Sequence, residues 1–332
     1  MASSVNQAFN EFLRDSVNLA PADTALARSS RDWLVNQIDR LPERHDDFPR
    51  LYPDVHIHYG SFARRTKIRE LDDLDMIIGI TALGTTYWEL PDRVELLVPD
   101  GIALRHLCHD GTNRLNSRRV INKFVKHLAE VPQYAKAEIK RNETAAVLNL
   151  SSYTWSFDVV PGFFTTPEYD GRTYYIIPDG SGHWMKTDPR VDEARAKSIN
   201  QAHGRNVLNV IRTVKYWNAR PTMPSIQPYL LECLILDYYN GRATAASEWV
   251  DLELASVLDH VSRAVLGSVQ DPKGIQGDIN LLSWDQRAAI STRASQDVAK
   301  CVAARKLESS GDHEASIEKW REVFGPAFPT YG

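Results

Sequence analysis

Residues 60–78 read GSFARRTKIRELDDLDMII, and this stretch decides the fold class of the chain. It joins a Gly-Ser pair to an apolar run in which Asp73 and Asp75 lie two residues apart. Side chains at i and i+2 of a β-strand project from the same face, so the two aspartates should point together while Leu74 and Met76 point into the core. Two neighbouring carboxylates repel each other strongly unless a cation lies between them. The stretch therefore predicts a strand that binds a divalent metal ion.

A third aspartate lies in a similar apolar setting farther along the chain. Asp158 belongs to the run Trp155 to Val160, whose alternation predicts a strand with one face toward a polar cleft. Mg²⁺ favours carboxylate, water and phosphate oxygens, and a two-metal site activates an attacking hydroxyl and stabilises leaving pyrophosphate. We therefore expect Mg²⁺ as the cofactor, with Mn²⁺ as the alternative. Asp73, Asp75 and Asp158 are expected to be its ligands and the catalytic residues.

The Gly-Ser pair is suited to phosphate binding. Gly60 lets the backbone approach a phosphate closely, the N–H groups of a turn or helix start can donate to it, and Ser61 adds a hydroxyl donor. Taken alone, Asp-x-Asp is common in solvated edge strands and turns, and Gly-Ser alone is an even weaker indication of a functional site. The ordered set of Gly-Ser, Asp-x-Asp and a distant Asp is much more specific. Asp72 is left out of the site, because it should point away from Asp73.

Length and composition indicate a globular protein of two domains or one large bilobal unit. The chain has 332 residues, 43% of them hydrophobic and 25% charged, which supports a substantial core. The net charge of −4 argues against non-specific binding to nucleic acid, although a local basic groove stays open as an alternative.

Cysteine usage and hydropathy predict a cytoplasmic protein. Cys108, Cys233 and Cys301 are scattered and odd in number, so they are expected to be buried free thiols in a reducing compartment. No apolar stretch approaches the ~20 residues that a membrane span needs. The N-terminus lacks the pattern of a signal peptide, so no membrane association is expected.

Hydrophobic periodicity divides the chain into a mixed first half and a helical second half. Helices are expected over 6–45 (two helices), 114–131, 191–219, 225–240, 245–267, 284–308 and 313–324, and strands over 55–59, 74–80, 92–98, 136–140, 144–150, 154–160 and 174–177. This gives three segments: residues 1–50, N-terminal helices that brace both lobes; 51–190, the catalytic core; and 191–332, a helical domain.

The motifs resemble those of the nucleotidyltransferase superfamily of DNA polymerase β. The resemblance rests on Tyr59-Gly60-Ser61, Asp73-Leu74-Asp75 and Asp158. Within that superfamily the chain is similar to the bacterial CD-NTases, relatives of cyclic GMP-AMP synthase and oligoadenylate synthase. Further stretches that carry the narrower resemblance are residues 60–68, 157–163, 184–189, 210–218, Ser225 with 229–232, and 324–329.

The resemblance implies a fold and further site residues. The fold would be α+β, a bilobal polymerase-β-like core of mixed sheet and helices followed by a C-terminal helical domain. Gly60 and Ser61 would hold the donor triphosphate, Lys215 would contact it from a helix, and Ser225 would assist. A solvated helix face is the alternative for Lys215, and a helix N-cap after Pro224 is the alternative for Ser225.

The implied function is Mg²⁺-dependent synthesis of a cyclic di- or trinucleotide second messenger in anti-phage (CBASS) signalling. Nucleoside triphosphates, ATP among them, would bind between the lobes. Regulatory or conjugating proteins of a defence operon are candidate partners that would act on the C-terminus at Gly332. The alternatives are an RNA-end nucleotidyltransferase of the CCA-adding or poly(A) type, against which the net charge argues, and a catalytically inactive nucleotide sensor. Base identity, ring size and 2′ or 3′ linkage stay open.

Overall fold

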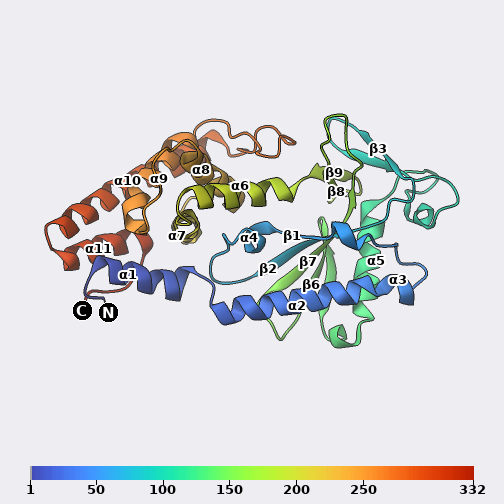
Figure 1. The fold of residues 1–332 in the computed structure, drawn as a ribbon, viewed down its shortest axis with the longest axis horizontal. Coiled ribbons are helices and arrows are strands. Elements are labelled where there is room, and N and C mark those ends of the chain that lie inside the picture. Colours follow the sequence, from blue (N-terminus) through green and yellow to red (C-terminus); the bar gives the residue numbers. More distant parts are fainter. Residues whose placement is uncertain (1) are drawn as a thin grey trace. The chain divides into compact units, whose positions relative to one another are not determined.

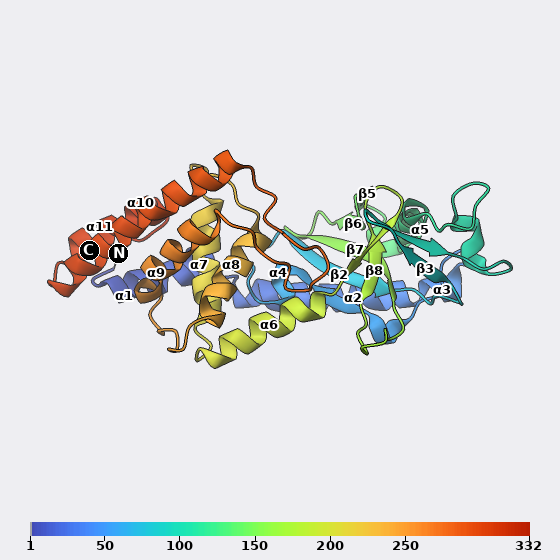
Figure 2. The same cartoon turned by 90° about the horizontal axis from the view of Figure 1, so that it is seen from above.

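The computed structural model of the protein describes residues 2–332, which pack into two compact units (Figures 1 and 2). The sheet unit comprises residues 22–63 and 71–190, and the helical unit comprises residues 2–21, 64–70 and 191–332. The chain therefore leaves the sheet unit for residues 64–70 and returns at residue 71. The division into segments 1–50, 51–190 and 191–332 stays a prediction.

A mixed β-sheet forms the centre of the sheet unit (Figure 1). Its main path runs β1-β2-β7-β8-β9-β4-β3, while β6 pairs with β7 and β5 with β6. The β2–β7 pair is parallel, and the other strand pairs in residues 2–332 are antiparallel. The strands are β1 (Ile57–Tyr59), β2 (Asp73–Gly79), β3 (Thr86–Glu89), β4 (Val94–Leu97), β5 (Glu138–Asn142), β6 (Ala145–Asn149), β7 (Ser156–Phe164), β8 (Tyr175–Pro178) and β9 (Trp184–Thr187).

Each strand predicted from the sequence is present, and two short strands were missed. β3 was not predicted because most of its side chains are exposed, Trp88 among them, so it has no apolar alternation. β9 lies in the aromatic-rich stretch after Pro161 and pairs with β8 over four residue pairs. Both strands have only four residues, and each pairs with a strand adjacent in the chain, β3 with β4 and β9 with β8.

The helices of the sheet unit are α2, α5 and two single-turn helices. α5 buries Val120, Ile121, Phe124 and Leu128, as its periodicity predicted, and the Asn116 side chain caps its N-terminus. The bounds are α2 (Pro21–Asp39), α3 (Leu41–Arg44), α4 (Gly60–Ala63) and α5 (Ser117–Ala129), with 3₁₀ turns at Pro53–Val55, Ala103–Leu107 and Pro132–Tyr134.

The helical unit packs around one hydrophobic core, in which Phe9 and Phe12 contact Phe324 and Phe328. α10 and α11 form a hairpin (Figure 1). The bounds are α1 (Val5–Phe12), continued by a π-helical turn (Leu13–Val17), α6 (Pro189–Ala202), α7 (Val207–Ala219), α8 (Pro228–Asn240), α9 (Val250–Ala264), α10 (Trp284–Ser309) and α11 (His313–Phe324).

Three helix predictions in this unit were wrong in detail, and one of them is 245–267, where α9 begins at Val250 and ends at Ala264. The segment 191–219 is two helices, because Gly204 and Arg205 have positive φ angles of 68° and 69° and end α6. Periodicity missed this break because both flanking segments are amphipathic. The helix predicted from residue 225 begins at Pro228, whose ring suits the first helical position.

The two ends of the chain meet within the helical unit (Figure 1). The Ala2 amide donates to the Thr330 carbonyl at 2.9 Å, and Ala2 pairs with Tyr331 in a parallel bridge. Among the helices of residues 2–332, none combines the length and apolar composition needed to cross a membrane. The three cysteines are buried free thiols, as predicted.

Candidate active site

Strand register brings two of the predicted acids together. β2 and β7 run parallel, with Asp75 directly opposite Asp158 and Asp73 opposite Ser156. Neighbouring strands lie about 4.8 Å apart and paired residues project from the same face, so the side chains of Asp75 and Asp158 start side by side. Asp73 projects from that face two positions earlier. All three aspartates are half-buried.

The apolar residues between the acids explain this orientation. Leu74 and Met76 are buried on the opposite face, as predicted from their alternation with the aspartates. Farther along the acids' own face, Ile77 and Val160 belong to a buried apolar cluster. The carboxylates therefore lie where the apolar part of this face ends.

Tyr59, the residue before Gly60 in the Gly-Ser motif, lies beside the acids although the sequence assigns it no role in the site. It pairs with Asp75 across β1 and β2, so it projects from the acids' face. Burial raises the pKa of the Tyr59 hydroxyl, and the negative charges of Asp75, Asp158 and Asp73 raise it further. The phenol thus stays neutral beside a concentration of negative charge.

The position of the Asp75 carboxylate requires a glycine at residue 60. Gly60 begins α4 directly after β1 and has a φ of 75°, which favours glycine. A Cβ atom at this position would lie 1.8 Å from Asp75 Oδ2 and 2.7 Å from its Cγ. Any side chain here would displace the carboxylate. Ser61 follows in the same short helix and is half-buried.

Asp72 differs from its neighbours, as expected. Its side chain is exposed, while its backbone carbonyl accepts hydrogen bonds from the Ser156 amide at 2.9 Å and the Ser156 hydroxyl at 3.2 Å. Asp72 therefore aligns the start of β2 with β7 through its main chain.

The acids fit the predicted metal. They provide hard oxygen donors on one half-buried face, and this donor set suits Mg²⁺ or Mn²⁺ rather than ions that prefer sulfur or imidazole. Asp73, Asp75 and Asp158 would hold the ion.

Lys215 lies on α7 in the helical unit, within a buried ion-pair cluster (defined here as Arg64, Thr66, Lys215 and Glu232). Its ammonium donates to Glu232 Oε2 at 3.0 Å and to the Thr66 carbonyl at 3.1 Å. Glu232 also accepts from Arg64 Nε at 2.7 Å and from the Thr66 hydroxyl at 2.8 Å. The alternative of a solvated helix face is wrong, because only 6% of Lys215 is exposed.

The ion-pair cluster carries more positive than negative charge. Burial alone would raise the pKa of Glu232, but the charges of Lys215 and Arg64 lower it to about 2. Burial lowers the pKa of Lys215, and Glu232 opposes that effect. Two cations thus share one carboxylate. Thr66 and Glu232 were not predicted as members of the site, because their contacts join segments that are distant in sequence.

Ser225 is exposed in the loop before α8. The alternative that it caps the next helix is wrong, because α8 begins at Pro228 and Gln227 occupies the N-cap position. Its assistance to the triphosphate stays a prediction.

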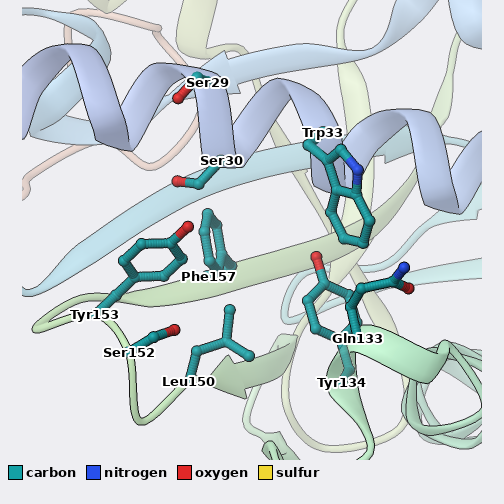
Figure 3. A pocket seen from close by; sticks show the side chains of 9 residues that line it. All are labelled: Ser29, Ser30, Trp33, Gln133, Tyr134, Leu150, Ser152, Tyr153 and Phe157. Carbon is teal, nitrogen blue, oxygen red and sulfur yellow. The ribbon is translucent and has the colours of Figure 1, made fainter.

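The sheet unit contains a cavity of about 470 Å³ (Figure 3). Phe157 contributes to its wall, and because side chains alternate along β7, this is the face opposite Asp158. Trp33 and Tyr134 meet edge to face across it, with ring centroids 5.4 Å apart. Its remaining lining residues are Ser29, Ser30, Gln133, Leu150, Ser152 and Tyr153. The cavity is therefore separate from the acids.

Comparison with known proteins identifies the family. No protein-family model matches the sequence. A probable cyclic nucleotide synthase of Bacillus cereus (strain VD146) is 44% identical over 336 residues, covering 100% of this chain and 99% of the relative. The chain belongs to the CD-NTase family of cyclic nucleotide synthases. This CD-NTase is therefore a nucleotidyltransferase, as the motifs predicted.

Solved structures agree with the predicted fold of this CD-NTase. CdnC of E. coli MS115-1, solved with ATP, superposes with a TM-score of 0.70 at 17% identity, over 98% of each chain. DncV of Vibrio cholerae, a cyclic AMP-GMP synthase, superposes with a TM-score of 0.57 at 13% identity, covering 83% of this chain and 69% of DncV. The prediction of an α+β core with a C-terminal helical part is confirmed.

Proposed function

We propose that this CD-NTase uses Mg²⁺ to join nucleoside triphosphates, ATP among them, into a cyclic di- or trinucleotide second messenger. The observation that carries the proposal is the register of Asp75 with Asp158, with Asp73 on the same face and Gly60 against Asp75. Three carboxylates on one half-buried face are costly unless they bind cations.

Each residue would contribute a separate part of the reaction. The ribose hydroxyl of one nucleotide attacks the α-phosphorus of another, a P–O bond forms, and the bond to the leaving pyrophosphate breaks. Asp158 orients the attacking hydroxyl and accepts its proton. Gly60 and Ser61 hold the triphosphate of the donor. When bound by the three aspartates, Mg²⁺ supplies Lewis-acid stabilisation of the phosphate charge.

Lys215 would contact the donor triphosphate. The ion-pair cluster has one more cation than anion, so it attracts negative charge even though Glu232 is ionised. Ser225, exposed in the loop that leads to α8, would assist at the same triphosphate.

Support for the substrate and product comes from relatives. The Bacillus cereus protein is a probable cyclic nucleotide synthase, CdnC was solved with ATP, and DncV is a cyclic AMP-GMP synthase. Ring closure would follow when the linear product turns round and its remaining triphosphate is attacked in the same site.

Product analysis tests this proposal. Purified protein incubated with all four ribonucleoside triphosphates and Mg²⁺ or Mn²⁺, without RNA, should yield cyclic products detectable by mass spectrometry. EDTA should abolish them. Products that form only on an added RNA end would favour the RNA-end nucleotidyltransferase. Absence of any product under both conditions would favour the inactive sensor, and either result would overturn the proposal.

We propose further that the protein acts in anti-phage (CBASS) signalling with partner proteins of a defence operon. CdnC was also solved in a complex with HORMA, which supports a regulatory protein partner. Tyr331 and Gly332 are exposed, while the Gly332 amide lies 3.4 Å from the Ala2 carbonyl that it donates to. Conjugation through Gly332 would therefore require only this short pairing to open.

Removal of Gly332 tests conjugation. Co-expression of N-terminally tagged protein with the neighbouring operon genes should give a slower-migrating conjugate, and deletion of Gly332 should abolish it while product synthesis in vitro is unchanged. A conjugate that persists after the deletion, or no conjugate with the intact chain, would reject this role of the C-terminus.

A further inference from the structure

A cluster of two histidines and a glutamate lies in the sheet unit, on elements that do not carry the catalytic acids. His45 follows α3, while His127 and Glu130 lie in and just after the last turn of α5. Both views place α3 beside α5 (Figures 1 and 2), and Phe48 packs against Phe124 of that helix. One ligand atom from each of His45, His127 and Glu130 lies within 4.8 Å of the other two.

Two of the distances between these atoms are compatible with a tetrahedral zinc site. Glu130 Oε2 lies 3.3 Å from His45 Nε2 and 3.2 Å from His127 Nδ1. With zinc–nitrogen and zinc–oxygen bonds of about 2.0–2.2 Å, two tetrahedral ligands are separated by about 3.3–3.5 Å. The two imidazole rings are in contact, with centroids 4.2 Å apart and an interplanar angle of 35°.

The second nitrogen of His127 has the environment expected of a zinc ligand. Nε2 lies 2.9 Å from Asp47 Oδ1, and only 1% of the side chain is exposed. Zinc-bound histidines commonly present their other N–H to a carboxylate, which sets the tautomer and the ring orientation. Lys123 and Lys126 hold Asp47 from its other oxygen, at 2.7 and 3.1 Å.

Without a metal, only the imidazolium form of His127, with an N–H on each nitrogen, can donate toward both of its carboxylate neighbours. His127 Nδ1 faces Glu130 and Nε2 faces Asp47, but a neutral imidazole has one N–H and cannot donate to both. Nε2 is buried and its contact with Asp47 lacks the alignment of a hydrogen bond. A cation bound at Nδ1 would put the N–H of the neutral ring on Nε2, the nitrogen that lies 2.9 Å from Asp47 Oδ1.

We propose that His45, His127 and Glu130 bind a zinc ion that joins the segment after α3 to the C-terminal end of α5. Two imidazoles and one carboxylate favour zinc over Mg²⁺, which prefers oxygen donors. Glu130 is half-exposed, so the fourth position opens to water. The ion would brace the helix that packs on β5 to β8, and it is independent of the metal used in catalysis.

Zinc titration of the untagged full-length chain, stripped with a chelator, tests the proposal. Calorimetry should show one zinc ion bound per chain, and cobalt(II) should give the visible absorption of a tetrahedral site. Zinc at about 100 times its Kd should raise the midpoint of thermal unfolding by about 4 °C. Cyclic-nucleotide synthesis is not part of this readout.

Variants separate the site from other histidines of the chain. Glu130→Gln and His45→Gln should each weaken zinc binding by at least about 100-fold, and Asp47→Asn by about 10–100-fold. Glu43→Gln on the exposed face of α3 and His183→Gln are the matched controls and should bind zinc like the parent chain. Because Glu130 is half-exposed, its variant should unfold at the parent's temperature in the chelator. No saturable binding to the parent, or equal binding by the Glu130→Gln/His45→Gln double variant, would overturn the proposal.

Discussion

Replacement of Asp75 by asparagine is expected to lower cyclic-nucleotide formation by about 10²–10⁴-fold, because it removes a ligand of the metal ion that would supply several kcal/mol of charge stabilisation in the transition state. The substitution keeps the shape of the side chain and removes one of two charges that lie opposite each other on β2 and β7. Asp158→Asn should have a similar effect, because it removes both a metal ligand and the group that accepts the proton. Product yield by mass spectrometry over a time course measures both.

Asp72→Asn is the matched control for this experiment. It makes the same chemical change three residues away on an exposed side chain, while the Asp72 carbonyl that binds Ser156 is untouched. It should leave product formation near the parent level. Asp75→Asn should also unfold at or above the parent's temperature in EDTA, because it relieves repulsion between carboxylates. An active Asp75→Asn protein, or an Asp72→Asn protein that fails equally, would contradict the proposed roles.

Lys215→Met is expected to weaken binding of a non-hydrolysable ATP analogue by about 10–100-fold, equivalent to the roughly 1.5–3 kcal/mol of a hydrogen bond to a charged group. Stability should change much less, because Arg64 and Thr66 still bind Glu232 when the lysine is gone. Calorimetric titration with the analogue measures affinity, and thermal unfolding measures stability.

Glu232→Gln should have the opposite effect, with a large loss of stability and a smaller change in affinity for the ATP analogue. It leaves the buried Arg64 and Lys215 charges facing each other without the carboxylate, and loss of one partner from such a buried pair costs about 3–5 kcal/mol of unfolding free energy. Lys197→Met, on the exposed side of α6, controls for removal of a lysine and should alter neither property. If Lys215→Met lowers stability as much as Glu232→Gln while the analogue still binds normally, Lys215 is structural and does not contact the triphosphate.

Much of the site could be predicted because strand alternation is a local property. Asp73, Leu74, Asp75 and Met76 alternate between half-buried and buried as their sequence predicts, since successive side chains of a strand point to opposite faces wherever that strand lies. Periodicity likewise predicted α5, α10 and α11 within a few residues of their ends.

Other features depend on contacts between distant segments. Asp158 lies opposite Asp75 only because β7 pairs with β2 in parallel at that register, and no local pattern specifies which strands pair. The break between α6 and α7 depends on two residues with positive φ angles that hydrophobic spacing does not reveal. The pairing of β9 with β4 likewise joins segments that are distant in the chain.

The sequence by itself determined the family, the α+β fold class and the orientation of Asp73 and Asp75, because motif spacing and side-chain alternation are written in neighbouring residues. Only the tertiary structure decided that Lys215 and Arg64 share the Glu232 carboxylate and that Gly60 lies against the Asp75 carboxylate. It also decided that His45 meets His127 and Glu130. These contacts join residues far apart in the chain, and their distances exist only once the sheet and helices have packed.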